Sequence, residues 1–228
     1  MAAMPASYFD VDGTLVSTNL IPPTLYYLLN QPTPLHVMQK LGGALLKAPT
    51  MAWAELRDRR LFNETLYSVF QGMSEDRLVT LADDVFDRVV RPAIYPGAKD
   101  LVQTSIDSGH DVILISGSLD VVIEHVAKYL GATGYIANRL EVHNLRCTGK
   151  LLRPVVAGPN KAILVRDHAR ENGHDLDECF AYSDSYSDVP MLSIVRYPVA
   201  VNPDRRLTQL AKAYSWPTIS LDSAARSA

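Results

Sequence analysis

Two aspartates separated by one residue stand near the start of the chain, directly after a short apolar run. The segment reads Asp10-Val11-Asp12-Gly13-Thr14 and follows Tyr8 and Phe9, and its glycine is typical of a turn. One carboxylate could serve as a nucleophile and the other as an acid and base, provided that a cation relieves their repulsion. This spacing therefore indicates metal-assisted chemistry at the end of a buried strand.

A second oxygen-rich segment, Tyr182 to Asp188, supplies two more acids, Asp184 and Asp188, after another apolar run. Mg²⁺ prefers octahedral oxygen coordination, keeps several waters and commonly uses one or two carboxylates together with a substrate phosphate. Neither His nor Cys stands among these acids, so the ligand types match Mg²⁺ better than zinc. Mg²⁺ is therefore the expected cofactor.

Three residues farther along the chain could bind a phosphate group. Phosphoryl transfer depends mainly on positioning and on charge stabilisation, so the equatorial oxygens need donors. Ser116 and the flexible Gly117 amide could provide neutral donors, and Lys161 could provide a fixed cation. Lys161 opens a predicted helix after Gly158-Pro159-Asn160, and a helix N-terminus already favours anions.

These residues follow apolar runs that predict the strands of a sheet. The runs are continuous rather than alternating, which is typical of parallel strands buried on both faces. They cover residues 6–9, 111–116, 179–182 and 197–201. Helical patterns lie between them, at residues 99–108, 119–130 and 160–172. The alternation predicts an α/β fold with a doubly wound parallel sheet, which binds ligands at the carboxyl ends of its strands.

The pattern changes between Thr18 and Pro92, where only helices are indicated. They are expected at residues 23–30, 35–47, 51–70 and 75–90. We therefore expect a core domain of residues 1–17 and 92–228, with an all-helical domain of residues 18–91 inserted after the first strand. Two short alternating runs around Asn144 and Gly149 also predict a β-hairpin within residues 136–155.

Taken in order, the motifs resemble those of the haloacid dehalogenase (HAD) superfamily, and within it the phosphoserine-phosphatase-like subfamily (subfamily IB). Four segments match: Asp10 to Thr14, Ile115 to Ser118, Lys161, and Asp184 to Asp188. The resemblance runs from about Tyr8 to Asn202. It implies a Rossmann-like core and a small all-helical cap that closes over the substrate and excludes bulk water.

The resemblance also implies a role for each matched residue. Asp10 would be the nucleophile, and Asp12 would protonate the leaving oxygen and later activate water. Mg²⁺ would be held by the Asp10 carboxylate, the Asp12 main-chain carbonyl and Asp184. Asp188 would support the metal shell, and Thr14 would support the loop. Ser116, Gly117 and Lys161 would hold the phosphate. The implied activity is Mg²⁺-dependent hydrolysis of a small phosphate monoester through an aspartyl-phosphate intermediate.

The nature of the leaving group is less well indicated. Phosphoserine phosphatases usually carry a Glu that receives the substrate's amino group where this chain has Asn19, so phosphoserine is disfavoured. Asn19 is still expected to contact the substrate. The segments Leu25 to Leu29 and Leu41 to Leu46 are apolar. Packing between helices is the favoured interpretation, and a pocket for an apolar leaving group stays open as the alternative.

Three other functions stay open. The chain could be a phosphoserine phosphatase proper, or it could transfer the phosphoryl group to a second acceptor, because a covalent intermediate permits either outcome. A receiver-type signalling module, which acts as a non-catalytic phospho-aspartate switch, also combines clustered acids, a hydroxyl and a lysine. The large insert and the paired Asp10 and Asp12 argue against such a switch, which needs no acid for a leaving group.

The bulk composition excludes several classes of protein. With 228 residues, 47% of them hydrophobic and 21% charged, the chain is typical of a folded globular protein. Its net charge of −3 provides no general attraction to nucleic acid. We interpret two short basic clusters as solvent-facing helix surfaces; they lie at 57–60, where Arg59 is included, and at 205–206. Two cysteines, the lack of a secretory-signal pattern and the lack of a transmembrane segment favour a cytoplasmic location. The oligomeric state is not predicted.

Overall fold

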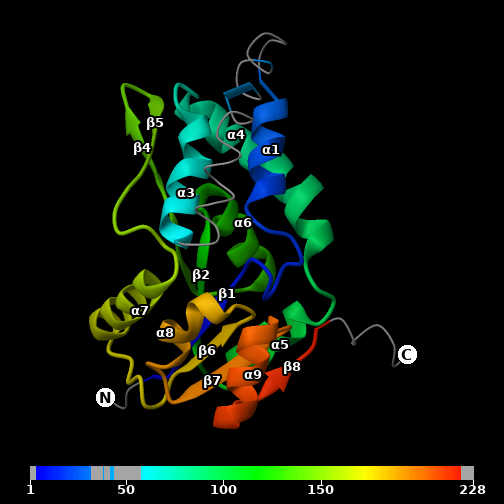
Figure 1. The fold of residues 1–228 in the computed structure, drawn as a ribbon, viewed down its shortest axis with the longest axis vertical. Coiled ribbons are helices and arrows are strands. Elements are labelled where there is room, and N and C mark those ends of the chain that lie inside the picture. The colour runs from blue at the N-terminus through cyan, green and yellow to red at the C-terminus, as the bar shows by residue number, and fades with distance from the viewer. Residues whose placement is uncertain (1–3, 32–37, 39–41, 44–57, 222–228) are drawn as a thin grey trace.

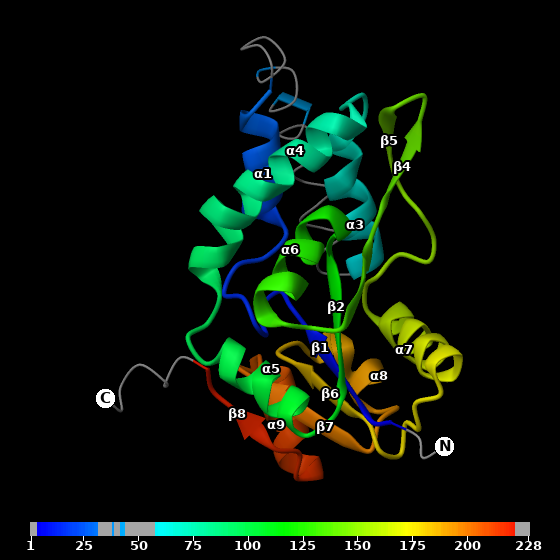
Figure 2. The same ribbon diagram turned by 180° about the vertical axis from the view of Figure 1, so that it is seen from behind.

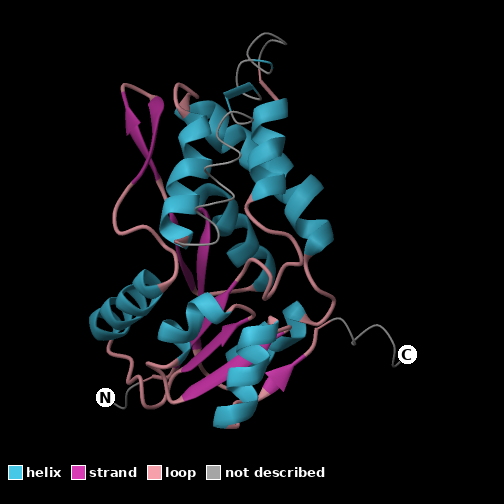
Figure 3. Cartoon of the chain, viewed as in Figure 1, coloured by secondary structure: helices cyan, strands magenta, loops and turns pink. Residues whose placement is uncertain are grey.

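The fold has two parts, an α/β layer and a group of helices beside it (Figure 1). The coordinates are a computed structural model, which describes residues 4–31, 38, 42–43 and 58–221. The helical group and a hairpin occupy one end of the long axis, and the sheet with its covering helices occupies the other (Figure 3). Functional side chains can therefore meet where the two parts face each other.

Six strands within the described residues form one parallel sheet. They are β1 (Ala6–Asp10), β2 (Asp111–Leu119), β3 (Gly134–Asn138), β6 (Phe180–Ser183), β7 (Tyr197–Val201) and β8 (Thr218–Ile219). Their order is β3-β2-β1-β6-β7-β8, and each neighbouring pair is parallel. The predicted α/β fold with a parallel sheet is confirmed.

The sheet is buried on both faces because successive side chains of a strand point in opposite directions. In β1, Tyr8 belongs to one buried cluster and Phe9 to the other. The same division occurs in β2, where Leu114 lies on the face of Phe9, and Ile113 lies on the face of Tyr8. Two hydrophobic faces explain why the strands read as continuous apolar runs in the sequence.

Helices cover both faces and bury their apolar sides against them. One face is covered by α5 (Ala98–Asp107) and α6 (Asp120–Leu130), which contribute Val102 and Val126 to the cluster of Phe9. The other face is covered by α7 (Pro159–Asn172), α8 (Val189–Leu192) and α9 (Arg205–Tyr214). Their side chains Val165, Leu192 and Leu207 belong to the cluster of Tyr8. The sheet is therefore doubly wound, as predicted.

The helical group consists of α1 (Ile21–Leu29), α3 (Arg59–Tyr67), which continues as a 3-10 turn at Ser68–Phe70, and α4 (Glu75–Val85). The chain after α4 continues as a π-helical turn, Phe86–Val90, and then a 3-10 turn, Arg91–Ala93. Helix α4 packs against α6, which joins the group to the α/β layer. The predicted helix at 35–47 and the first part of the one at 51–70 lie outside the described residues, apart from residues 38 and 42–43.

A β-hairpin stands beside the helical group. Strands β4 (Leu140–His143) and β5 (Arg146–Leu151) pair antiparallel, and Asn144 and Leu145 form the turn with positive φ angles. The hairpin lies along α3, which β5 contacts (Figure 2). The prediction of a hairpin within residues 136–155 is confirmed, and the same region also contains Ile136, which belongs to β3 in the main sheet. As a half-exposed edge strand, β3 has no continuous apolar run that would predict it.

The chain changes direction across the sheet between β1 and β6. From β1 it proceeds outward to β2 and β3, and it then returns to build β6, β7 and β8 on the other side. A crevice forms at the carboxyl ends of strands at such a switch point. No helix in the described part of the chain is both long enough and apolar enough to cross a membrane.

Candidate active site

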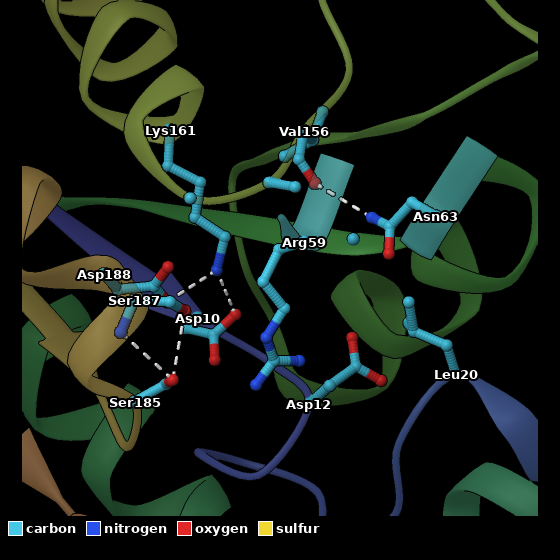
Figure 4. A pocket seen from close by; sticks show the side chains of 13 residues that line it. Asp10, Asp12, Leu20, Arg59, Asn63, Val156, Lys161, Ser185, Ser187 and Asp188 are labelled. Carbon is cyan, nitrogen blue, oxygen red and sulfur yellow. Dashed lines mark hydrogen bonds and ion pairs between the residues drawn. The ribbon is translucent and has the colours of Figure 1, made fainter. Parts of the chain in front are cut away.

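A cleft lies at the carboxyl ends of β1, β2 and β6, where the α/β layer faces α3 (Figure 4). Its empty volume is about 410 Å³, a value that includes the open solvent at its mouth. The residues that line it come from the strand ends, from the loop before α7 and from α3: Asp10, Asp12, Leu20, Arg59, Asn63, Gly117, Val156, Ala157, Gly158, Lys161, Ser185, Ser187 and Asp188.

A buried lysine joins two of the predicted acids. Lys161 lies in the first turn of α7 and is only 5% exposed. Its Nζ is 2.6 Å from Asp10 Oδ1 and 2.7 Å from Asp188 Oδ2, and Asp188 also accepts a 2.8 Å hydrogen bond from Ser183. Burial lowers the pKa of Lys161, but the charges of Asp10 and Asp188 outweigh it and raise the pKa above its usual value. The lysine is therefore a fixed cation beside Asp10.

Thr14 brings Asp10 and Asp184 together. Its hydroxyl lies 3.0 Å from Asp10 Oδ2 and 3.0 Å from Asp184 Oδ1, and its oxygen accepts a 2.9 Å hydrogen bond from the Asp184 backbone N–H. Burial and then the charge of Asp10 raise the pKa of Asp184 to about 8. Two close carboxylates that resist joint ionisation are a suitable place for a divalent cation.

Gly13 makes the approach of Asp184 possible. Its φ is +91°, a conformation that glycine adopts without steric cost. A Cβ atom at this position would lie 2.3 Å from Asp184 Oδ2. Only glycine therefore satisfies both the turn after Asp12 and the close packing against the second acidic loop.

Asp12 turns away from the other acids and toward the end of β2. Its carboxylate accepts a hydrogen bond of 2.7 Å from Ser116 Oγ and two of 3.1 Å from Ser118 Oγ. Burial and then the charge of Asp10 raise the pKa of Asp12 to about 6, although the two serines lower it. A carboxyl group with this pKa can both donate and accept a proton near neutral pH.

The predicted phosphate donors differ in whether they line the cleft or are already hydrogen-bonded to another site residue. The Ser116 hydroxyl is fully buried and donates to Asp12, and its oxygen accepts from the Ser118 backbone N–H at 2.9 Å. Gly117 lines the cleft, and a Cβ there would lie 2.9 Å from Asn63 Nδ2. Gly117 and Lys161 are therefore directly placed at the cleft, whereas the Ser116 side chain holds Asp12 in this arrangement.

The donor set fits Mg²⁺ through the carboxylates of Asp10 and Asp184, the two carboxylates expected as direct ligands. Among the residues that the structure describes, no three His, Cys, Asp or Glu side chains converge closely enough to hold a metal ion. The Asp12 side chain faces the serines, and only its main-chain carbonyl is expected as a ligand. Asp188 faces Lys161, whereas Asp10 and Asp184 share the Thr14 hydroxyl. Mg²⁺ commonly uses one or two carboxylates, with waters and a phosphate completing the shell, so the residues present fit this ion.

Four predicted site residues do not line the cleft themselves. Thr14, Ser116 and Asp184 stand behind Asp10 and Asp12 and are joined to them through hydrogen bonds, whereas Asn19 has no such contact among the described residues. The Asn19 side chain is exposed, and its Oδ1 accepts a 3.0 Å hydrogen bond from the Ile21 backbone N–H at the start of α1. This contact, two residues along the chain, is typical of an Asx turn. A role for Asn19 in substrate binding stays a prediction.

Helix α3 contributes two residues that sequence reasoning missed. Arg59 was interpreted as part of a solvent-facing surface; it is exposed, and it also lines the cleft near Asp12 (Figure 4). Asn63, one turn later, lines it as well. Arg60 agrees with the interpretation, because it is exposed and pairs with Asp58 at 2.8 Å. The i, i+4 spacing of Arg59 and Asn63 was the available signal, since it places both on one face of a helix.

The apolar stretch of α1 does not line the cleft. Tyr27 and Leu28 are buried in the core, whereas Leu25 and Leu29 are 42% and 50% exposed. Leu20 is the residue from this region that reaches the cleft. The second apolar stretch, 41–46, lies outside the described residues except for 42–43. Packing therefore accounts for the buried half of the first stretch.

Comparison with known proteins agrees with this geometry. The family model of haloacid dehalogenase-like hydrolases matches residues 8–193. Phosphoserine phosphatase SerB1 of Mycobacterium tuberculosis (strain ATCC 25618 / H37Rv) is 38% identical over 64% of this chain, and the match spans 47% of that relative, about half its length. Histidinol-phosphatase of Neisseria meningitidis serogroup C is 30% identical over 93% of this chain and 96% of its own. A protein of unknown function from Bordetella pertussis Tohama I has a solved structure with a TM-score of 0.80 and 23% identity, covering 96% of this chain and all of its own.

Proposed function

The chain belongs to the haloacid dehalogenase-like hydrolases, and from this membership we propose that it is a Mg²⁺-dependent phosphatase of a small phosphate monoester, with Asp10 as nucleophile. The observation that carries the proposal is the position of Asp10. One carboxylate oxygen lies 2.6 Å from the Lys161 ammonium, and the other faces Thr14, which also contacts Asp184. A carboxylate held in this way points into the cleft with a cation beside it.

Lys161 supports the attack on phosphorus. In the proposed reaction an Asp10 oxygen forms a bond to phosphorus, the bond to the leaving oxygen breaks, and an aspartyl-phosphate results. The negative charge on the transferring group is stabilised by the Lys161 ammonium and by the backbone N–H groups near Gly117. Mg²⁺ bound by Asp10, Asp184 and the Asp12 carbonyl would neutralise charge on the phosphate and orient it.

Asp12 supplies the proton chemistry. With a pKa of about 6, it can donate a proton to the leaving oxygen and then accept one from the water that attacks the aspartyl-phosphate. Ser116 and Ser118 hold its carboxylate in place. The same residue thus acts as acid in the first step and as base in the second.

We assign residues 1–17 and 92–228 to a core domain and residues 18–91 to a cap. The cap helix α3 supplies Arg59 and Asn63 to a cleft whose reactive groups come from the core. Hydrogen bonds also cross between the parts; those near the cleft include one from Tyr67 Oη to the Gly117 carbonyl at 3.1 Å and one from Asn63 Nδ2 to the Val156 carbonyl at 3.4 Å. Such an arrangement suits a cap that excludes water from the reaction.

Relatives suggest more than one leaving group. The two named relatives are called phosphoserine phosphatase and histidinol-phosphatase. Both names describe small phosphate monoesters. Phosphoserine is the second candidate substrate, and Asn19 in place of an acid remains the reason to rank it lower. Transfer of the phosphoryl group to an acceptor other than water is the second candidate reaction, because an aspartyl-phosphate permits it.

The test is phosphate release from p-nitrophenyl phosphate, phosphoserine, histidinol phosphate, phosphoethanolamine and a sugar phosphate, with Mg²⁺ and with EDTA. We expect turnover with Mg²⁺, no turnover with EDTA, and no turnover for Asp10→Asn, because an amide is a poor nucleophile. Asp177→Asn is the matched control, since Asp177 is exposed and does not line the cleft. Wild-type turnover by Asp10→Asn would refute the proposal, and a stable phosphoprotein without turnover would support a signalling switch instead.

A further inference from the structure

Asn63 brings a single amide group into the reaction cleft from the cap helix α3. The residue is only 2% exposed, yet it lines the cleft together with Asp12 and Gly117. Its Nδ2 lies 3.4 Å from the Val156 carbonyl oxygen (Figure 4). A Cβ at position 117 would lie 2.9 Å from Nδ2, so Gly117 leaves the space that the amide occupies.

The core determines which way this amide faces. Asn138, which is 1% exposed, accepts a 2.8 Å hydrogen bond from the Val156 N–H and donates one of 2.8 Å to the Gly117 carbonyl. The Val156 peptide is therefore held firmly, with its carbonyl oxygen toward Asn63. A carbonyl can only accept, so the nitrogen of the Asn63 amide must face it.

The oxygen of Asn63 is consequently turned away from Val156. Figure 4 shows the amide oxygen on the side opposite Val156, toward Leu20. Among the described residues, no donor forms a hydrogen bond to this Oδ1. Because Asn63 lines the cleft, a donor on a bound molecule can reach this oxygen.

We propose that Asn63 Oδ1 accepts a hydrogen bond from a neutral donor, such as a hydroxyl, on the leaving group, and that it thereby determines substrate preference. The inference rests on the phosphatase function proposed above. Asp10, Asp12, Asp184 and Asp188 are each bound to Lys161, a serine or Thr14, whereas no described donor binds the amide oxygen of Asn63.

An ammonium group is a poorer match for this position. A neutral amide can accept from an ammonium but does not compensate its charge once water is excluded. Arg59 lies one turn before Asn63 on the same face of α3 and adds positive charge to the same cleft. A hydroxyl meets the requirement for a donor without either penalty.

The test uses two substrates that differ in one group, 2-hydroxyethyl phosphate and 2-aminoethyl phosphate. For the wild-type enzyme with Mg²⁺ we expect kcat/KM to be roughly tenfold higher for the hydroxyl compound, as a paired buried acceptor predicts. Asn63→Asp should reverse the preference, because a carboxylate compensates the ammonium. Asn63→Leu should bring the ratio close to one. Asn172→Asp, at the exposed end of α7, is the control for an added charge and should keep the wild-type ratio.

The ratio of the two substrates separates this inference from the function on which it rests. An unchanged ratio in Asn63→Asp, with turnover of both substrates, overturns the role of Asn63 and leaves the phosphatase intact. A wild-type preference for the amine overturns it as well. If Asn63→Leu does not fold, as judged by thermal unfolding, the Asp variant decides alone. Absence of turnover with every phosphate ester, p-nitrophenyl phosphate included, rejects the phosphatase and the inference together.

Discussion

The cleft has two sides that differ in how firmly their side chains are held. In the strand-end wall, which consists of Asp10, Asp12, Thr14, Lys161, Asp184 and Asp188, each acid is bound to a donor from another segment. In the α3 wall, which consists of Arg59 and Asn63, the two side chains have few partners among the described residues. On the strand-end side, contacts of 2.6 to 3.0 Å link Asp10, Thr14, Lys161, Asp184 and Asp188. On the α3 side, and counting described residues alone, Asn63 has one hydrogen bond, of 3.4 Å, and Arg59 forms no ion pair.

This difference separates two tasks. Side chains that are tied together by short, charged contacts lose little further freedom when the reaction begins, which suits groups that must be placed accurately. Side chains with unused donors or acceptors keep their binding capacity for a ligand. We therefore expect changes in the strand-end wall to affect kcat and changes in the α3 wall to affect KM and substrate choice.

Lys161→Met should have a large effect in the strand-end wall, because it lowers both activity and stability. The variant removes the cation that contacts Asp10 and leaves Asp10 and Asp188 buried without it. Loss of one preorganised donor costs roughly 10² to 10³-fold in kcat, and removal of one partner of a buried ion pair also destabilises the fold by roughly 3–5 kcal/mol. Steady-state kinetics and thermal unfolding measure the two effects.

Lys128→Met is the matched control for this loss of charge. Lys128 pairs with Glu124 at 2.7 Å, but its side chain is 70% exposed. A surface pair of this kind contributes little to stability. Equal losses of kcat in the two lysine variants would contradict the distinction between the strand-end wall and the surface.

The strand-end wall is also the part that sequence reasoning predicted well. Asp10, Asp184 and Lys161 stand at the ends of apolar runs or at the start of a helix, and parallel strands place such positions at one edge of the sheet. Local patterns do not report which hydroxyl meets which acid. The pairing of Ser118 with Asp12 depends on where β2 ends relative to β1, which is a tertiary property.

The α3 wall was predicted poorly for a physical reason. A basic residue on a short helix is usually solvated, and nothing in the local sequence tells that the α3 face with Arg59 and Asn63 is opposite the strand ends. Asn138 was missed for a similar reason, because β3 is an edge strand without a continuous apolar run. Residues whose role depends on packing between distant segments leave no periodic signal.

Asp12→Asn should reveal the acid role through the leaving group. A good leaving group departs without a proton, so we expect roughly 10-fold loss or less for p-nitrophenyl phosphate in the first step and roughly 10² to 10⁴-fold loss for an alkyl phosphate. A series of phenyl phosphates with graded leaving-group pKa measures the dependence. A loss that is equal across the series would assign Asp12 to structure rather than to proton transfer.

Arg59→Leu should act on binding, as expected for the α3 wall. The guanidinium lines the cleft near Asp12 and forms no ion pair among the described residues, so its charge is available to an anionic substrate. We expect KM to rise roughly tenfold, equivalent to about 1.4 kcal/mol, with a smaller change in kcat. Arg60→Leu removes the same charge from the adjacent position, where Asp58 already neutralises it. A selective fall in kcat for Arg59→Leu, or an equal effect of both variants, would show that α3 does not bind substrate in this way.

Asp184 should make the stability of the metal-free protein depend on pH in an unusual direction. Burial and Asp10 raise its pKa from 3.8 to about 8, so the native state keeps a proton that the unfolded state has released between these values. Stability then falls as the pH rises through this window, because the native state binds more protons than the unfolded state. For one proton, the free energy of unfolding changes by about 1.4 kcal/mol per pH unit. For a chain of this size, each kcal/mol shifts Tm by about 2–4 °C.

The range from pH 7 to 8 isolates this effect. The raised pKa of Asp12, about 6, and the lowered pKa values of His110 and His168 act mainly below that range. In EDTA we expect the Tm of the wild-type protein to fall between pH 7 and 8, and the Tm of Asp184→Asn to stay nearly constant, as measured by differential scanning calorimetry. Mg²⁺ should remove the wild-type slope, since a bound cation stabilises the ionised carboxylate. Parallel curves for the wild type and Asp184→Asn in EDTA would mean that the strand-end acids are not crowded enough to need a cation, and the contrast between the two walls would then lose its electrostatic basis.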